Sequence, residues 1–290
     1  MKWRRARQSS NLEDRRGQRG PAMRGLPKIG LGGIALVLVI GWFMGISPVE
    51  MLSLLTQQGP TDSRSSSAPA PSSPQAQQQA KFVGAILGET EDVWATVFQQ
   101  SGKRYPPPTL VLFSGQVRSA CGAATSAVGP FYCPGDQQVY LDTEFFDQMR
   151  RRLGGGGDFA EAYVIAHEVG HHVQTVTGSS RPVIEARQRG QNLEGADGLL
   201  VRQELQADCF AGLWAHHAQA RHNWLEPGDI EEALNTASAI GDDQLQKQAR
   251  GTVVPDSFTH GSAKQRVRWF RLGFETGDFS RCDTFSARRL

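Results

Sequence analysis

The sequence predicts an α+β fold, a mainly helical domain with a small sheet, preceded by a single N-terminal transmembrane helix. Three observations lead to this prediction. Residues 29–46 form an uncharged apolar run, residues 57–80 are rich in small and polar side chains, and the remainder combines two strand-like segments with several stretches of helical periodicity. We therefore divide the chain into a tail over 1–28, a membrane helix over 29–46, a linker over 47–80 and a domain over 81–290.

The N-terminal tail, residues 1–28, is strongly basic. It contains Lys2, Lys28 and seven arginines against two acidic residues, Glu13 and Asp14, whereas the whole chain has a formal net charge of +2. Because the basic character is confined to this tail, it gives no indication of nucleic-acid binding, and the chain contains no nucleic-acid-binding motif. Positively charged flanks of membrane helices stay in the cytoplasm, so we expect a cytoplasmic tail.

Residues 29–46 are long enough, at about 18 residues, to span a bilayer as a helix. Trp42 lies toward the far end, where interfacial aromatic residues are common. One alternative is a cleaved signal peptide, but its apolar region is shorter, about 7–15 residues, and residues 47–50 (SPVE) do not form a small-residue cleavage site. The other alternative is a buried core helix, which the basic and polar flanks oppose. We expect a signal anchor.

Residues 47–80 are expected to form a disordered linker. Most residues between 57 and 80 are Ser, Pro, Gln or Ala, and this stretch has too few large apolar side chains to order itself. It would tether the domain to the membrane. The predicted arrangement is a single-pass protein of the cell membrane, with a cytoplasmic N-terminus and an extracytoplasmic domain, either periplasmic or extracellular.

The chain has four cysteines, an even number that suggests disulfides in an oxidising compartment. Cys121 and Cys133 are close in sequence and could close a loop, which leaves Cys209 to pair with Cys282. The spacings match no structural zinc motif. If the domain instead faced a reducing cytosol, buried free thiols would be expected.

The first part of the domain is predicted to contain helices and two strands. Apolar side chains at helical spacing predict helices between residues 81 and 102, and three consecutive prolines end them. Residues 109–113 and 138–142 predict strands. Thr143 can cap a helix that continues through Met149.

The second part of the domain is predicted to be mostly helical. Glycines 154–157 indicate a loop, and Asp158 is the expected N-cap of the helix that follows. Further helices are expected at about 196–220, 227–238 and 261–276.

The segment AHEVGHHV, residues 166–173, contains an H-E-x-x-H motif. His167 and His171 are four residues apart, about 400° of rotation on a helix, so both imidazoles project from one face and can bind one ion. Glu168 points beside that face, where a metal-bound water would lie. The neighbouring residues are largely apolar and predict a buried helix, in which Gly170 permits close approach of another backbone.

His172 is expected to have a different role from the other two histidines. It lies about 140° round the helix from His167 and cannot reach the same ion without breaking the helix. We assign it a packing or surface role.

The third metal ligand is expected in the segment QELQAD, residues 203–208. A catalytic zinc ion has three protein ligands and one position for water. Glu204 and Asp208 lie one turn apart on an otherwise apolar helix, where a buried carboxylate is costly unless it meets a charge or a metal. We expect Glu204 to bind zinc and Asp208 to accept a hydrogen bond from a ligating imidazole. The alternative is a pair of carboxylates that form salt bridges with Arg202 or another arginine.

The chain resembles the bacterial family of predicted neutral zinc metallopeptidases, within the gluzincin-like group whose signature is HExxH followed by ExxxD. The likeness extends over nearly the whole chain. Its segments are 14–17 (DRRG), the membrane segment, 129–134 (GPFYCP), 139–142 (VYLD), 167–171, 204–212 and 259–262 (THGS). The resemblance implies a zincin-like domain with one Zn²⁺ on His167, His171 and Glu204, and with Glu168 as the general base.

The resemblance also suggests a group that stabilises the oxyanion. Related membrane-associated peptidases have a similar His-to-Arg segment, which makes His260 the first candidate for the oxyanion donor and Arg266 the second. A capping or packing role for His260 is the alternative. By analogy, residues 138–142 would form an edge strand that binds an extended peptide, with an ordinary core strand as the alternative.

Two classes of function follow from these predictions. The first is a membrane-anchored zinc endopeptidase that acts on envelope proteins or peptides. The second is a membrane-tethered interaction module of the envelope with a structural metal site. The presence of Glu168 favours the first, because a structural site needs no base and usually has a protein ligand at its fourth position. The sequence does not indicate the oligomeric state.

Overall fold

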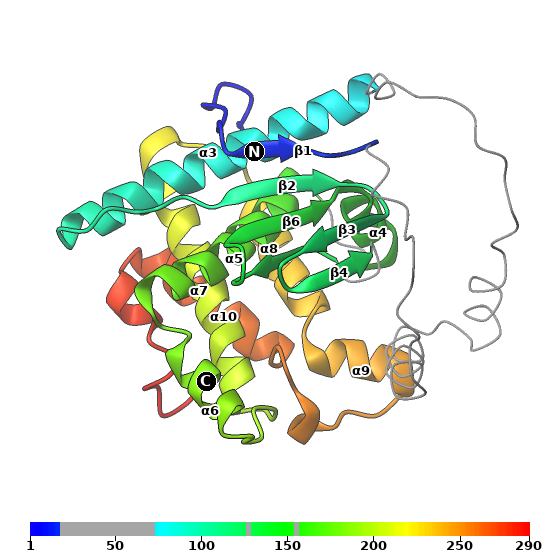
Figure 1. Ribbon diagram of the computed structural model, residues 1–290, viewed down its shortest axis with the longest axis vertical. Coiled ribbons are helices and arrows are strands. Elements are labelled where there is room, and N and C mark those ends of the chain that lie inside the picture. Colours follow the sequence, from blue (N-terminus) through cyan, green and yellow to red (C-terminus); the bar gives the residue numbers. More distant parts are fainter. Residues whose placement is uncertain (18–72, 126–128, 154–156) are drawn as a thin grey trace, which may run out of the picture.

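A four-stranded sheet packed beside a set of long helices forms the body of the protein. The computed structural model describes residues 1–17, 73–125, 129–153 and 157–290 (Figure 1). Helices α3 (Pro74–Gln100) and α5 (Asp158–Thr177) pack against each other on one face of the sheet. Helix α7 (Leu199–His222) packs against both of them and against α10 (Ala263–Thr276). The predicted α+β class, mainly helical with a small sheet, is confirmed.

The sheet has the strand order β1-β2-β6-β5. Strands β1 (Leu12–Asp14), β2 (Thr109–Phe113) and β6 (Gln138–Asp142) are parallel, and β5 (Phe131–Cys133) is antiparallel to β6. The strands predicted at 109–113 and 138–142 are therefore confirmed with the same bounds.

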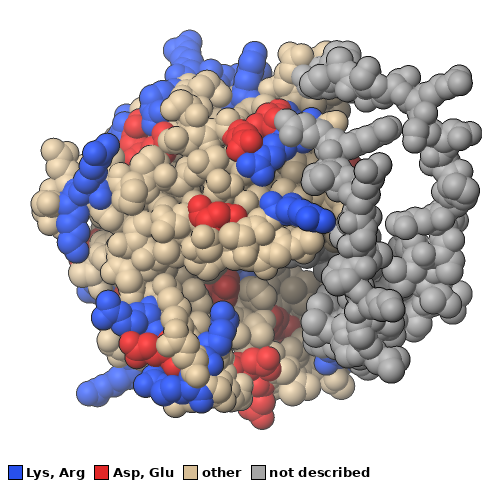
Figure 2. Space-filling view, in the orientation of Figure 1, with Lys and Arg blue, Asp and Glu red and all other residues tan. Residues whose placement is uncertain are grey.

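The two central strands are buried on both faces. Leu110 and Leu112 of β2 belong to the main core, whereas Val111 and Phe113 pack in a smaller cluster with the hairpin of β3 (Gln116–Ser119) and β4 (Gly122–Thr125). On the face that carries this sheet, basic and acidic side chains are interspersed (Figure 2).

The expectation that residues 138–142 form an edge strand is wrong. β6 lies between β2 and β5 and bonds to both, so it is a core strand, the alternative considered above. The edge of the sheet on this side is β5, which also packs against α5. The short strand β5 has little sequence pattern of its own, which explains why the edge was assigned to its longer neighbour.

Helix α3 (Pro74–Gln100) begins inside the region predicted as a linker, so the boundary at residue 81 is wrong. Ser73 caps the helix by accepting a hydrogen bond from the Ala76 backbone, and Pro74 occupies its first turn. The Gln and Ala residues that follow are good helix formers. From composition alone, these Gln and Ala residues were predicted to belong to the polar linker that precedes them.

The remaining helices agree with the predictions in most places. The helix that carries the H-E-x-x-H motif is α5 (Asp158–Thr177), and its N-cap is Gly157 instead of the expected Asp158. The other helices are α4 (Thr143–Leu153), α6 (Arg181–Gln188), α7 (Leu199–His222), α8 (Asp229–Ala239), α9 (Asp242–Arg250) and α10 (Ala263–Thr276), with 3₁₀ turns at Pro255–Ser257 and Phe279–Cys282. The sequence analysis did not predict α6 and α9.

Residues 1–17 are part of the folded body, so the division of the chain at residue 28 into a separate tail is wrong for this stretch. Strand β1 pairs with β2 in register Leu12 to Leu110, and Trp3 is buried in the main core. The nearby arginines form ion pairs that a count of charges does not reveal.

The predicted transmembrane helix, residues 29–46, lies outside the described residues, as does most of the predicted linker. Among the helices that are described, none is both long enough and apolar enough to cross a membrane.

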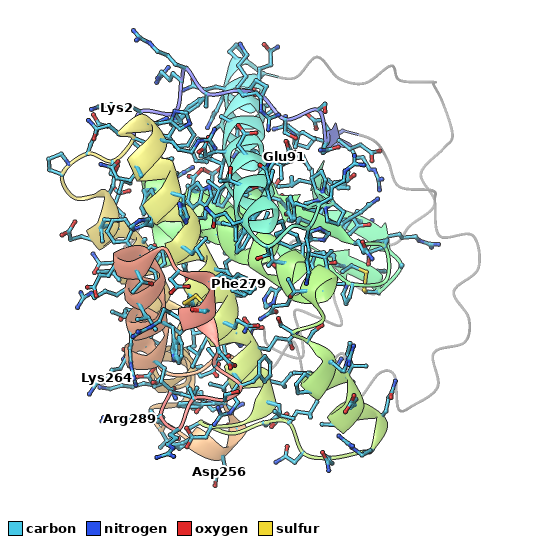
Figure 3. All side chains as sticks on the ribbon, turned by 90° about the vertical axis from the view of Figure 1, so that its left-hand side faces the viewer. Lys2, Glu91, Asp256, Lys264, Phe279 and Arg289 are labelled. Carbon is cyan, nitrogen blue, oxygen red and sulfur yellow. A yellow bond between two sulfur atoms is a disulfide. The ribbon has the colours of Figure 1, made fainter. Side chains whose placement is uncertain are left out.

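Two disulfides tie distant elements together, and both expected pairings are confirmed. Cys121, in the turn between β3 and β4, is bonded to Cys133 of β5. Cys209 of α7 is bonded to Cys282 in the 3₁₀ turn that contains the labelled Phe279 (Figure 3). The second disulfide attaches the C-terminal segment to the helix that carries Glu204.

Candidate metal centre

Two histidines of α5 and one glutamate of α7 come together between these helices. His167 Nε2 lies 3.1 Å from Glu204 Oε2, and His171 Nε2 lies 3.5 Å from Glu204 Oε1. One donor atom from each of the three residues lies within 4.8 Å of the other two. Bonds of about 2.0–2.1 Å in a tetrahedral zinc site separate the ligand atoms by about 3.3 Å, so the arrangement fits one ion.

Close packing of α5 against α7 brings Glu204 to the imidazoles. A Cβ atom at Gly170 would lie 3.1 Å from both Cα and the carbonyl oxygen of Ala207, so a larger side chain here would force the helices apart. The side chains of His167, His171 and Glu204 are 9%, 14% and 19% exposed. The site is therefore largely shielded from water but still accessible from solvent.

Asp208 fixes the orientation of His167. Its Oδ1 accepts a hydrogen bond from His167 Nδ1 at 2.8 Å, with Nδ1 carrying the proton, and leaves Nε2 directed toward the metal position. Asp208 is fully buried and also accepts from Tyr163 at 2.5 Å and from two guanidinium nitrogens of Arg266 at 2.9 Å. The expected contact between Asp208 and a ligating imidazole is present in the structure.

Gln174 has the corresponding role at His171 and was not identified from the sequence. Its Oε1 lies 2.9 Å from His171 Nδ1, and its Nε2 donates to the Gln203 carbonyl at 2.7 Å and to Gln206 Oε1 at 3.1 Å. Gln174 is fully buried. Its position three residues after His171, on the same helix face, was the available signal.

Neighbouring charges determine the protonation of these groups. Burial lowers the pKa of His167, but the charge and hydrogen bond of Asp208 outweigh burial and raise this pKa to about 10. Burial raises the pKa of Glu204, but the two histidines hold it well below its usual range. Glu204 is therefore a carboxylate at neutral pH, and a metal ion that binds here displaces the Nε2 proton of His167.

Glu168 follows His167 on α5, beside the candidate metal ligands. It is 9% exposed and forms no hydrogen bond or ion pair within the described part of the chain. A carboxylate at this position of an H-E-x-x-H helix can accept a proton from a metal-bound water.

The two candidates for the oxyanion donor lie in different environments. Arg266 is 3% exposed and donates two hydrogen bonds to Asp208. His260 is half exposed and lies close enough to Glu204 for their charges to interact. Of the two candidates, His260 is the more exposed to solvent.

Asp242 holds the loop that carries His260. A single carboxylate oxygen of Asp242 accepts three backbone hydrogen bonds, from Thr259, His260 and Gly261, at 2.7, 2.7 and 2.9 Å. Its other oxygen lies 3.5 Å from His260 Nδ1. Asp242 is the first residue of α9, a helix that was not predicted, and no sequence pattern connects it with the site.

His172 packs away from the metal ligands, as expected. It is 1% exposed, its Nε2 lies 2.6 Å from the Pro106 carbonyl oxygen, and its Nδ1 lies 3.2 Å from the Tyr132 hydroxyl. Burial lowers its pKa, so the ring is neutral. The alternative considered for Glu204 and Asp208 was a salt bridge with Arg202 or another arginine. Asp208 does pair with Arg266, whereas the Arg202 guanidinium donates to the carbonyls of Thr284, Phe285 and Ala287.

Two cavities of about 740 Å³ each lie outside this centre. One is lined by the N-terminal segment together with residues of α3 and the loop after α7, and the other by residues near the C-terminal end of α5 and the turn Phe279–Cys282. Neither is lined by the three donor residues. We identify the site from its donor atoms, because cavity size carries no information about metal ligation.

A helix with two histidines and an adjacent glutamate, completed by a carboxylate from a second helix, defines the centre as a candidate zinc metallohydrolase site. The chain belongs to the family described as "Putative neutral zinc metallopeptidase", which it matches over residues 1–285. The resemblance noted in the sequence is therefore confirmed at the level of the family.

Two relatives show how far the similarity extends. "Uncharacterized protein YpfJ" of Escherichia coli K12 is 48% identical over 290 residues, covering 98% of this chain and 99% of the relative. "Uncharacterized protein Rv2575" of Mycobacterium tuberculosis H37Rv is 44% identical over 260 residues, covering 85% of each chain. No solved structure matches the chain.

Proposed function

We propose that the protein is a zinc-dependent endopeptidase that hydrolyses peptide bonds of other proteins. The observation that supports this most is the convergence of His167, His171 and Glu204 beside an unpaired Glu168. Three protein ligands leave one zinc position for water, and a neighbouring carboxylate is the group needed to activate it. A structural site would not need Glu168.

In the proposed reaction, bound zinc supplies Lewis-acid chemistry: it lowers the pKa of water toward neutrality and polarises the scissile carbonyl. Glu168 takes the proton from the attacking water and then transfers it to the leaving amine. His260, held by Asp242, donates a hydrogen bond to the oxyanion. Asp208 and Gln174 keep both imidazoles in the orientation that directs Nε2 to the metal.

The substrate is proposed to be an extended peptide. Among the described strands, β5 is the edge of the sheet next to α5, so a peptide strand can be added along its outer side through main-chain hydrogen bonds. A protein segment must be locally unfolded to bind in this way, which favours unfolded or flexible proteins as substrates.

We further propose that the enzyme acts at the cell membrane, on proteins or peptides of the envelope. The apolar run at 29–46 supports membrane attachment, and the two disulfides support an oxidising compartment. The sidedness of this attachment is treated in the next subsection.

The test is the substitution Glu168→Gln in the zinc-loaded chain, which keeps the size of the side chain and removes the base. We expect one zinc per chain to remain and the rate of cleavage of an unfolded protein such as casein to fall by about 10²–10⁴-fold. Glu185→Gln, an exposed carboxylate on α6, is the matched control and should leave the rate unchanged. If the wild-type chain binds one zinc but cleaves no unfolded protein, the interaction module with a structural metal site is the better account.

A further inference from the structure

The N-terminal segment, residues 1–17, is bound to the rest of the chain as an element of the fold. The Leu110 backbone donates to the Asn11 carbonyl at 2.9 Å, and the Arg15 backbone donates to the Leu112 carbonyl at 2.8 Å. These bonds make β1 the outer strand of the sheet beside β2. Without them, the edge of β2 would be open.

A buried tryptophan anchors the start of this segment. Trp3 is 6% exposed and packs edge-on against Phe82 of α3, with 5.2 Å between ring centroids. Its Nε1 donates to Asp158 at 2.8 Å, and Asp158 is the first residue of the helix that carries His167 and His171. The segment thus contacts the helix of the metal centre directly.

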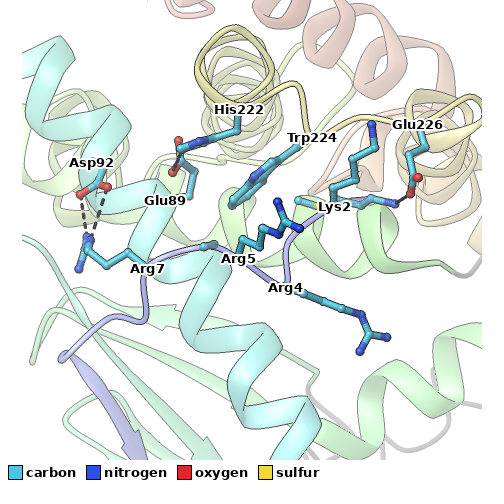
Figure 4. Close-up of a pocket in the computed structure, with 11 residues that line it drawn as sticks. Lys2, Arg4, Arg5, Arg7, Glu89, Asp92, His222, Trp224 and Glu226 are labelled. Carbon is cyan, nitrogen blue, oxygen red and sulfur yellow. Dashed lines mark hydrogen bonds and ion pairs between the residues drawn. The ribbon is translucent and has the colours of Figure 1, made fainter.

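Helix α3 is shaped to receive the segment. A Cβ atom at Gly88 would lie 2.6 Å from the Arg7 carbonyl oxygen, so only glycine permits this approach. Arg7 donates to the Gly88 carbonyl and to Glu91 and Asp92 at 2.7 to 2.8 Å, and the pair with Asp92 is drawn in Figure 4. Glu91, labelled on α3 in Figure 3, also accepts from Ser9 and Asn11.

These contacts restrict how the two parts of the chain can lie relative to a membrane. Residues 1–17 precede the apolar run at 29–46, and residues 73–290 follow it. A segment that crosses a bilayer once places its two flanks on opposite sides, where they cannot form one sheet and share one core. We infer that residues 1–17 and 73–290 lie on the same side of any membrane to which the protein is attached.

This inference does not depend on the proposed peptidase activity, and it replaces the expected topology of a cytoplasmic tail and an extracytoplasmic domain. If the disulfides form in the oxidising compartment, the N-terminal segment is exported together with the domain.

The test measures labelling of the variants Arg5→Cys and Arg187→Cys in the full chain. Both arginines are exposed, and the native cysteines are paired, so only the introduced thiol reacts. A membrane-impermeant maleimide is applied to intact spheroplasts and, separately, to lysed cells. We expect the same ratio of intact to lysed labelling for both variants, whichever side they occupy. Labelling of position 187 in intact spheroplasts with labelling of position 5 only after lysis would overturn the inference.

A second measurement tests whether the segment is docked in the detergent-solubilised full chain. Gly88→Ala in an undocked helix should raise the Tm, because alanine favours the helix over glycine. With the Arg7 carbonyl 2.6 Å from the new Cβ, we expect the Tm to fall by about 2–8 °C. An unchanged or raised Tm would show that the segment is not docked and would contradict the inference.

Discussion

The metal centre and the N-terminal segment are held in the fold by different means. At the metal centre, Asp208 and Gln174 are fully buried polar groups that orient the two histidines. In the N-terminal segment, one buried tryptophan is combined with ion pairs near the surface, such as Arg7 with Glu91. Changes at the metal centre should therefore affect both metal binding and stability. Changes in the N-terminal segment should affect stability alone, apart from the one bond to Asp158.

The largest effect is expected for Glu204→Gln, which removes a charged ligand from the metal centre. An outer partner of a ligand typically contributes 10–100-fold to metal affinity, and loss of the ligand itself should exceed about 100-fold. Zinc per chain after dialysis should fall from about one to near zero. Glu194→Gln, an exposed carboxylate just before α7, should keep its zinc. Retention of zinc by Glu204→Gln would exclude Glu204 as a ligand.

Asp208→Asn tests whether the metal centre couples metal binding to stability. The substitution leaves the buried guanidinium of Arg266 without its counterion, which should lower the free energy of unfolding by about 3–5 kcal/mol. It also weakens the hydrogen bond to His167, and zinc affinity should fall by about 10–100-fold. Urea unfolding and a zinc titration measure the two quantities. A change in the free energy of unfolding without a change in zinc affinity, or the reverse, would contradict the proposed coupling.

Trp3→Ala tests the opposite expectation for the N-terminal segment. Removal of this buried ring should lower the free energy of unfolding by about 3 kcal/mol, while zinc affinity changes little. Trp3→Phe keeps most of the packing and loses the bond to Asp158, at a cost of about 1 kcal/mol. A large loss of zinc affinity in Trp3→Ala would mean that the segment also shapes the metal centre.

Glu161 lies on α5 between Asp158, which binds Trp3, and His167. Its titration predicts a smaller effect, a change of stability with pH. Burial raises the pKa of Glu161 to about 7, although Arg150 opposes this. Because the folded state favours the protonated form, the stabilisation is present below pH 4.5 and is lost as the pH rises through 7. Glu161→Gln, which cannot ionise, should gain about 3 kcal/mol relative to wild type between pH 4.5 and pH 8, measured by urea unfolding. If the difference in unfolding free energy between Glu161→Gln and wild type does not change with pH, Glu161 stays ionised in the folded protein over this range.

The sequence predicted the parts of the protein that depend on local spacing. His167, Glu168 and His171 lie on one helix, and Glu204 and Asp208 on another, so the helical period was enough to group each set. The two central strands were also recognised from their apolar side chains. Gly170 indicated close helix packing, which the structure places opposite Ala207.

The parts that the sequence did not predict depend on partners far away in the chain. In the sequence, nothing distinguishes Arg7 from the other arginines of the tail. Its ion pairs with Glu91 and Asp92 form only in the folded protein. Asp242 and His260 are connected only by the fold of the loop before α10. Arg266 was considered only as the second candidate for the oxyanion donor, because nothing in its local sequence indicates that it binds Asp208.

X-ray absorption at the zinc edge of the zinc-loaded chain tests the assignment of the metal ligands most directly. The structure predicts one zinc per chain, bound by two imidazole nitrogens and a carboxylate oxygen at about 2.0–2.2 Å, with a fourth light ligand from water. Each of the variants His167→Ala and His171→Ala should lose one of the two imidazole contributions or the bound zinc itself. Sulfur ligation at about 2.3 Å, or a zinc ion without imidazole ligands, would contradict the account.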